Sequence, residues 1–229
     1  MASPQARAEF YREVQLMLGM EPHRNVVRTY GVIIDNAEHT FWIVMEHLAG
    51  SLDKIVYNPS NHAQLSEDEM IGFARGIAQG MAHLAKLKIV HRDLAVRNVL
   101  LSKDSTAKIS DFGMSRVLGS ELEGQTASTV GPIFWMSPEA LMQRFSEKSD
   151  VWAYGVTLWE IVTGKEPYEG RDKLEVAIQV RDHGMTLPMP EKSPKILATI
   201  MKRCWKYDPS ERPTFAEICN MLGVAPTSE

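Results

Sequence analysis

Helical periodicity dominates the chain from Ser66 onward. Apolar side chains recur three and four positions apart after Ser66, and Ser66 and Glu69 have the spacing of a capping box. Residues 149–162 are apolar on nearly every face, which predicts a buried central helix that ends at Gly164. Further helices are expected at three later positions: 172–183, 193–206 and from Thr214, which with Glu217 forms a second capping box. The pattern therefore predicts a large helical part.

The front of the chain has a different pattern. Residues 9–19 read as an amphipathic helix, and residues 25–34 and 40–46 as two strands joined by the turn residues Asp35-Asn36. Residues 48–51 break the pattern. We therefore expect a linker there, between a small front part and the helical remainder.

Composition narrows the class of protein. With 229 residues, the chain is long enough for one large core or for a large domain with a smaller one attached. Its 44% apolar and 24% charged residues are typical of an ordinary soluble globular protein. The net charge of −4 argues against nonspecific nucleic-acid binding. Cys204 and Cys219 fall in helical patterns, which favours buried free thiols over a disulfide. No signal peptide is expected in residues 1–8, and the most apolar stretch, 151–162, is too short to span a bilayer. A cytoplasmic location follows, or the cytoplasmic part of a membrane receptor if the chain is a fragment.

The chain is organised around residues 89–101, where apolar residues flank a charged centre on both sides. This pattern predicts two buried strands joined by a loop. The loop carries Asp93 and Asn98, and a second carboxylate follows at Asp111. Phosphoryl transfer needs these groups: one carboxylate takes or orients the proton of the attacking hydroxyl, and carboxylate and amide oxygens hold Mg²⁺.

These residues stand in two motifs, H-R-D-L-x-x-x-N at 91–98 and D-F-G at 111–113, by which the chain resembles the protein kinases. Arg97, four residues after the aspartate, is the tyrosine-kinase pattern. The segments 132–141 and 204–213 resemble tyrosine-kinase segments as well. The resemblance implies ATP and Mg²⁺ as cofactors and a protein with a tyrosine acceptor as substrate.

The resemblance also implies a role for each matching residue. In catalysis, Asp93 would be the base, Arg97 would assist at the substrate hydroxyl or phosphate, and Asn98 and Asp111 would bind Mg²⁺. The nucleotide would contact Met45 as gatekeeper, the backbones of Glu46 and Leu48, and Leu100. Structural support would come from Glu13, His91, Arg92, Phe112, Gly113, Glu139, Asp150 and Arg212. Within this set, Glu13 would pair with a strand lysine, Asp150 would hold the catalytic-loop backbone, and Glu139 would pair with Arg212. Ordinary roles remain open, since a helical glutamate such as Glu13 is often only a solvated charge, and residues 41–48 also suit a plain core strand and exit loop.

One part of the kinase pattern is absent ahead of Glu13. A Gly-rich loop and a strand lysine should precede that helix, but the first glycine is Gly19 and the first lysine is Lys54. Removing one preorganised donor costs on the order of 10²–10³-fold in rate, so the loss expected here is at least that large. The remaining strands should also present an unpaired edge and an uncovered apolar face.

Two further departures concern regulation and substrate docking. No tyrosine lies between Asp111 and Glu139. The phosphorylation candidates there are instead hydroxyl residues that Arg92 could pair with once modified: Ser120, Thr126, Ser128 and Thr129. Phe134 stands where tyrosine kinases commonly carry a basic residue, which bears on peptide docking.

The expected fold is α+β and protein-kinase-like, with a truncated small lobe of one helix and about two strands and a largely intact helical large lobe. The expected domains are a partial small lobe with hinge over 1–48, a large lobe over 49–223 and a tail over 224–229. The leading function is transfer of the ATP γ-phosphoryl group to protein tyrosine. The alternatives are a catalytically silent, pseudokinase-like binding module, which would present its helical lobe to a regulatory partner, and a fragment of a longer active kinase.

Overall fold

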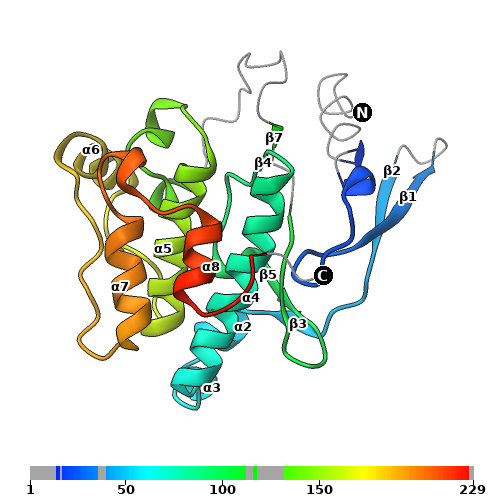
Figure 1. The fold of residues 1–229 in the computed structure, drawn as a ribbon, viewed down its shortest axis with the longest axis horizontal. Coiled ribbons are helices and arrows are strands. Elements are labelled where there is room, and N and C mark those ends of the chain that lie inside the picture. Colours follow the sequence, from blue (N-terminus) through cyan, green and yellow to red (C-terminus); the bar gives the residue numbers. More distant parts are fainter. Residues whose placement is uncertain (1–13, 16, 36–39, 112–115, 118–131, 227–229) are drawn as a thin grey trace.

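The N-terminal part of the molecule contains a two-stranded hairpin. The computed structural model describes residues 14–15, 17–35, 40–111, 116–117 and 132–226. Strands β1 (Thr29–Asp35) and β2 (Thr40–Met45) pair antiparallel, with Ile33 opposite Trp42. The first of these strands begins four residues later than the expected residue 25. Residues 14–15 and 17–19 are helical, as predicted for the front helix, and they lie beside this hairpin (Figure 1).

The segment before β1 ties the hairpin to the rest of the protein. Val26 forms a parallel bridge with Ile109, and the Val27 N–H donates to the Ile109 carbonyl at 2.9 Å. The Asn25 side chain donates to the Ala107 carbonyl at 2.9 Å. These long-range bonds explain why residues 25–27 are not part of β1, since their backbone groups pair with β6 of another sheet.

That second sheet contains three short strands. They are β3 (Gly50–Ser51), β5 (Val99–Leu101) and β6 (Ala107–Ile109), in the order β3-β5-β6. The linker expected at residues 48–51 is therefore partly wrong, since its last two residues pair with β5. A further two-stranded sheet joins β4 (Ile89–Val90) to β7 (Arg116–Val117). The prediction of two buried strands on either side of the charged loop is confirmed by β4 and β5.

Helices form the larger part of the molecule (Figure 1). Helix α4 (Glu67–Lys86) begins at the predicted Ser66–Glu69 capping box. Helix α5 (Glu147–Thr163) is buried along nearly its whole length and ends at Gly164, as predicted. The outer helices are α6 (Lys173–His183), α7 (Lys195–Cys204) and α8 (Phe215–Met221), the last with the predicted Thr214–Glu217 box. Helix α5 packs against α7 and α4, and α4 packs against α8.

Short helical turns complete the fold. They are α2 (Asp53–Val56), α3 (Pro59–His62) and the 3₁₀ turns η1 (Val96–Asn98), η2 (Ile133–Trp135), η3 (Ala140–Met142) and η4 (Pro209–Glu211). One continuous hydrophobic core runs from α4 through α5 to α7 and α8. Cys204 and Cys219 are buried free thiols within it, as predicted.

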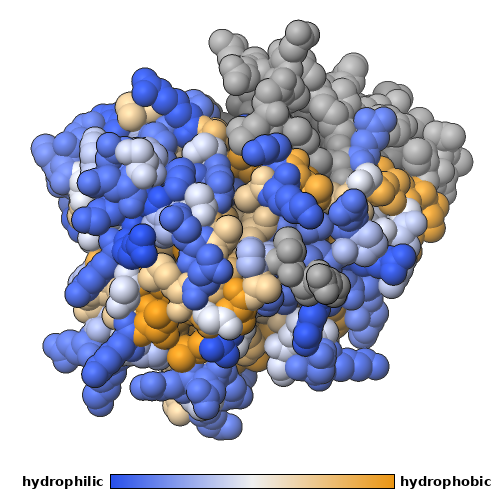
Figure 2. All heavy atoms as spheres, in the orientation of Figure 1, coloured by the Kyte–Doolittle hydropathy of each residue, from blue (hydrophilic) through white to orange (hydrophobic). Residues whose placement is uncertain are grey.

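One face of the hairpin is apolar and exposed. Trp42 is 63% exposed and Ile33 opposite it is 57% exposed. Val44, two residues after Trp42, lies on the same face and is also exposed, and Met45 and Tyr30 are further exposed apolar residues of the hairpin. Figure 2 shows apolar residues gathered over this hairpin at the edge of the molecule. The expected uncovered apolar face is therefore present among the described residues.

Candidate functional site

The loop between β4 and β5 is held by a buried carboxylate from α5. Asp150 accepts the His91 N–H at 2.7 Å and the Arg92 N–H at 2.9 Å, one on each oxygen. Arg92 has φ of +70°, a conformation that a non-glycine residue adopts only with support from its surroundings. The two bonds to Asp150 supply that support. Burial raises the pKa of Asp150 to about 7, while the two backbone N–H groups act in the opposite direction.

His91 is a structural residue of this loop. Its Nε2 donates to the Ser110 carbonyl at 3.0 Å, and its Nδ1 accepts the Asp93 N–H at 3.3 Å. This pairing requires the neutral tautomer with hydrogen on Nε2. Full burial lowers the pKa of His91 and favours the same neutral form. The His91 ring therefore links the catalytic loop to Ser110, which lies between the end of β6 and Asp111.

The two residues expected to bind Mg²⁺, Asn98 and Asp111, are linked through Ser110. The Asn98 Nδ2 donates to the Asp93 carbonyl at 2.7 Å, so its Oδ1 is the amide atom left for a ligand. The N–H and the hydroxyl of Ser110 both donate to the Asn98 carbonyl at 2.9 Å. Asp111 follows Ser110 directly, with φ of +61°. One amide oxygen and one carboxylate fit Mg²⁺, which binds few protein oxygens and completes its shell with water and phosphate.

Arg97 lies between Asp93 and an aromatic ring. Its Nη2 forms an ion pair with Asp93 Oδ1, and its guanidinium stacks on Trp135 with 4.3 Å from Cζ to the ring centroid. Trp135 belongs to η2, in the segment expected to form the substrate platform. The arginine therefore connects the candidate base to that platform.

Glu139 and Arg212 form a two-pronged ion pair, with N–O distances of 2.6 and 3.0 Å. The Arg212 side chain is fully buried, and its guanidinium also donates to three backbone carbonyls: those of Lys206, Lys148 and Tyr207. This pair anchors the segment that follows η2 to the loop before α8.

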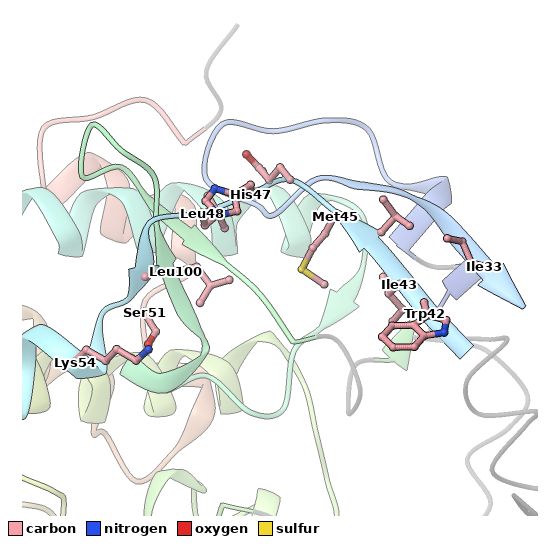
Figure 3. A pocket seen from close by; sticks show the side chains of 12 residues that line it. Ile33, Trp42, Ile43, Met45, His47, Leu48, Ser51, Lys54 and Leu100 are labelled. Atoms are coloured by element: carbon pink, nitrogen blue, oxygen red, sulfur yellow. The ribbon is translucent and has the colours of Figure 1, made fainter. Parts of the chain in front are cut away.

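A pocket of about 660 Å³ lies between the hairpin and the three-stranded sheet. Figure 3 shows Met45, Leu48 and Leu100 along it, with Lys54 and Ser51 at one end and Ile33 and Trp42 at the other. All four residues expected to contact the nucleotide in this region, Met45, Glu46, Leu48 and Leu100, line it. The volume of this pocket and its mainly apolar lining suit a nucleobase.

Glu46 is fixed at the edge of this pocket. Its Oε1 accepts the Arg28 N–H at 2.8 Å and the Lys108 ammonium at 2.9 Å, and its own N–H donates to the Arg28 carbonyl. Because the Glu46 N–H is already used, a hydrogen bond between the Glu46 backbone and the nucleobase would have to involve the Glu46 carbonyl. These bonds also hold the hairpin against β6.

Some expected residues lie outside the described part of the chain. They are Glu13, Phe112 and Gly113, together with the phosphorylation candidates Ser120, Thr126, Ser128 and Thr129. Among the described residues, no group of three or more His, Cys, Asp or Glu side chains could hold a metal ion. The described helices also include none long and apolar enough to cross a membrane.

Sequence reasoning missed two polar residues next to this loop, the buried Glu160 and the half-buried Tyr57. Glu160 lies within α5 and accepts bonds from Tyr57 and Trp135. The available signal was an acidic residue inside an otherwise apolar helix, which is rare unless the charge has partners.

A helical body that carries a carboxylate–amide–carboxylate site below a small sheet and an apolar pocket is a protein-kinase-like fold. The chain belongs to the protein tyrosine and serine/threonine kinase family, whose model matches residues 1–222. This family match, together with the relatives described next, shows a catalytic domain of the tyrosine-kinase type.

Curated relatives of this chain include proteins named as tyrosine kinases. The chain is 41% identical over 217 residues to the megakaryocyte-associated tyrosine-protein kinase of Rattus norvegicus, covering 93% of this chain and 44% of the relative. It is 38% identical over 225 residues to ephrin type-A receptor 3 of Danio rerio, covering 96% and 22%. It is 38% identical over 232 residues to the tyrosine kinase receptor Cad96Ca of Drosophila melanogaster, covering 94% and 29%. The chain thus spans less than half the length of these relatives.

Proposed function

We propose that this chain supplies the catalytic loop and the substrate platform for transfer of the ATP γ-phosphoryl group to protein tyrosine. The observation that carries the proposal is the loop geometry: Asp150 holds the backbone before Asp93, Asn98 holds its carbonyl, and Arg97 holds its carboxylate. Preorganisation of this kind is most of what phosphoryl transfer asks of a protein.

In the proposed reaction the tyrosine hydroxyl oxygen attacks the γ-phosphorus, and the bond from that phosphorus to the bridging oxygen of ADP breaks. Asp93 accepts the hydroxyl proton. Arg97 orients Asp93 and lies within reach of the phenol oxygen or the transferred phosphoryl group, because it is stacked on the platform residue Trp135. Arginine four residues after Asp93 is the pattern of tyrosine kinases, and this resemblance supports tyrosine as the acceptor.

Nucleotide binding is assigned to the pocket along Met45, Glu46, Leu48 and Leu100. Asn98 Oδ1 and Asp111 would hold Mg²⁺, which neutralises phosphate charge when bound. The 229 residues contain neither glycine nor lysine ahead of Glu13.

A second candidate is a kinase-derived binding module without turnover. The exposed apolar face around Ile33 and Trp42 favours it, since contiguous apolar surface is a common feature of interaction sites. A regulatory protein would then be the partner. In either case we propose a cytoplasmic setting, alone or as part of a receptor, and a boundary between the two lobes near residue 48.

A thermal-shift measurement with Mg²⁺ and ATP separates the two candidates. A ligand at 100 times its Kd stabilises by about 2.7 kcal/mol, which is about 5–10 °C for a chain of this size. Asp111→Asn should abolish the shift, because it removes the carboxylate assigned to Mg²⁺. The matched control is Asp182→Asn, which alters an exposed aspartate paired with Arg181.

Tyrosine-peptide phosphorylation is measured on the same proteins. A shift that Asp111→Asn removes and Asp182→Asn keeps, together with turnover that Asp93→Asn abolishes, supports the kinase. A shift without turnover, or no shift at all, rejects the kinase proposal for this polypeptide and favours the binding module.

A further inference from the structure

Glu160 is a buried acid that the proposed phosphoryl transfer does not use. It lies in the middle of α5, is fully buried, and is surrounded in the helix by apolar residues. An isolated charge in such a place is strongly disfavoured unless hydrogen-bond donors surround it. The donors around this carboxylate therefore indicate what it does.

Three donors from three different elements converge on the Glu160 carboxylate. The Tyr57 hydroxyl, just after α2, donates to Oε1. The Trp135 indole N–H, from η2, donates to Oε2 at 2.8 Å. The Val96 N–H, at the start of η1, points at the same oxygen at 3.4 Å. One side chain thus links the helix beside the pocket, the catalytic loop and the platform.

The indole bond extends this link to the candidate base. The Trp135 ring carries the Arg97 guanidinium at 4.3 Å, and Arg97 is paired with Asp93. We propose that Glu160 is a positioning residue, which orients Asp93 by fixing the Trp135 ring on which Arg97 stacks. This inference deepens the proposed phosphoryl transfer and rests on it.

The charge state of Glu160 follows from its surroundings. Burial raises its pKa to about 7, and the bonds from Trp135 and Tyr57, the Val96 N–H and the charge of Arg97 act in the opposite direction. The ionisable groups that face it are Tyr57 and Arg97, and Glu166 acts on Tyr57 in turn. Burial raises the pKa of Tyr57, so its hydroxyl stays protonated and donates.

The chemistry of the donors dictates the variants. An indole N–H and a backbone N–H can only donate, so the Trp135 side needs an acceptor. Glu160→Gln keeps an amide oxygen there and turns its NH₂ toward the Tyr57 oxygen, which can accept. Glu160→Leu has similar bulk and no acceptor. The matched control is Tyr154→Phe, which removes a buried hydroxyl of the same helix that bonds to Ala74 at 2.9 Å and does not touch Glu160.

The first readout is nuclear magnetic resonance of the Arg97 side chain and the tryptophan indoles. The ring current of Trp135 should shift the Arg97 side-chain protons upfield in the native chain, in Glu160→Gln and in Tyr154→Phe. Glu160→Leu should lose that shift and move the Trp135 indole signal, while the Trp159 indole, bonded to Pro188 at 2.8 Å, stays in place. An unchanged Arg97 shift in Glu160→Leu would overturn the inference.

A titration keeps the inference testable if Glu160→Leu does not fold. Between pH 5 and pH 8 the Trp135 indole signal should move with a midpoint near 7 in the native chain. It should stay constant in Glu160→Gln. A native indole signal that does not titrate, or one that titrates equally in Glu160→Gln, contradicts the proposed link between Glu160 and Trp135.

The second readout is kinetic. Glu160→Leu should lower kcat for a tyrosine peptide by about 10- to 10²-fold with an unchanged KM for MgATP, because misplacing a catalytic group by about 1 Å costs up to that much. Glu160→Gln should restore most of it. An equal fall in Tyr154→Phe would reduce Glu160 to a stability role. If the native chain shows no turnover, the phosphoryl-transfer proposal fails, and the Arg97 shift alone decides whether Glu160 positions the loop.

Discussion

Removal of Glu139 should expose the cost of a buried cation without its partner. The Arg212 side chain has no exposed surface and the Glu139 side chain is 13% exposed, and both terminal guanidinium nitrogens of Arg212 donate to Glu139. Loss of one partner of a buried pair typically costs about 3–5 kcal/mol. Three backbone carbonyls and the Trp152 ring, 5.1 Å from Cζ, still hold Arg212. We therefore expect Glu139→Ala to cost about 3 kcal/mol, the lower end of that range.

Urea unfolding followed by tryptophan fluorescence measures this cost, and calorimetry should show Tm lower by about 6–12 °C. The control is Glu175→Ala. Its pair with Arg171 has a similar N–O distance, 2.7 Å, but the two side chains are 55% and 42% exposed. Such pairs contribute about 0–1 kcal/mol. A loss below about 1 kcal/mol for Glu139→Ala, or equal losses for both variants, would refute the burial argument.

Three other outcomes follow from the structure. The folded-state pKa of Glu160 lies above its ordinary value of 4.5, so the folded chain binds more protons, and Glu160 should lower the free energy of unfolding by up to about 3 kcal/mol from pH 4.5 to 7. Glu160→Gln should therefore make the urea-midpoint profile less steep, with the slope due to Asp150 remaining, and a parallel profile would contradict this. Gly164→Ala should lower the free energy of unfolding, measured with urea, by about 2 kcal/mol. Gly164 has φ of +67°, and a Cβ there would lie 2.8 Å from the His62 ring. His62→Ala in the same chain should recover part of that loss. Trp42→Ser should reduce self-association measured by light scattering, because Trp42 is 63% exposed on an apolar face, and an unchanged mass would argue against that face as the contact.

Local patterns predicted well wherever the stabilising partners are close in the chain. The capping boxes at Ser66 and Thr214 join residues three apart, and both form as expected. The stop of α5 at Gly164 is also local, because it requires only a left-handed residue after the last turn. The spacing of Asp93, Asn98 and Asp111 likewise indicates phosphoryl transfer from the sequence alone, and the family match agrees with that class.

Predictions failed or were missing where a partner lies far along the chain. Gly50 and Ser51 have low strand propensity, and they form β3 only because β5 offers backbone partners. Residues 25–27 were expected to begin the first strand of the hairpin, yet they pair with β6. Backbone hydrogen bonds with distant segments overrode local preference in both places.

The sequence by itself determined the helical large part, the two strands around the catalytic loop and the tyrosine-kinase type of the domain. Only the tertiary structure decided which side chains hold the catalytic loop in place. Glu160 reads in the sequence as one acid in an apolar helix, and its partners Val96 and Tyr57 lie 64 and 103 residues away. Periodicity reports which face of a helix is buried, but the donors that meet a buried carboxylate depend on which distant elements the fold packs around it.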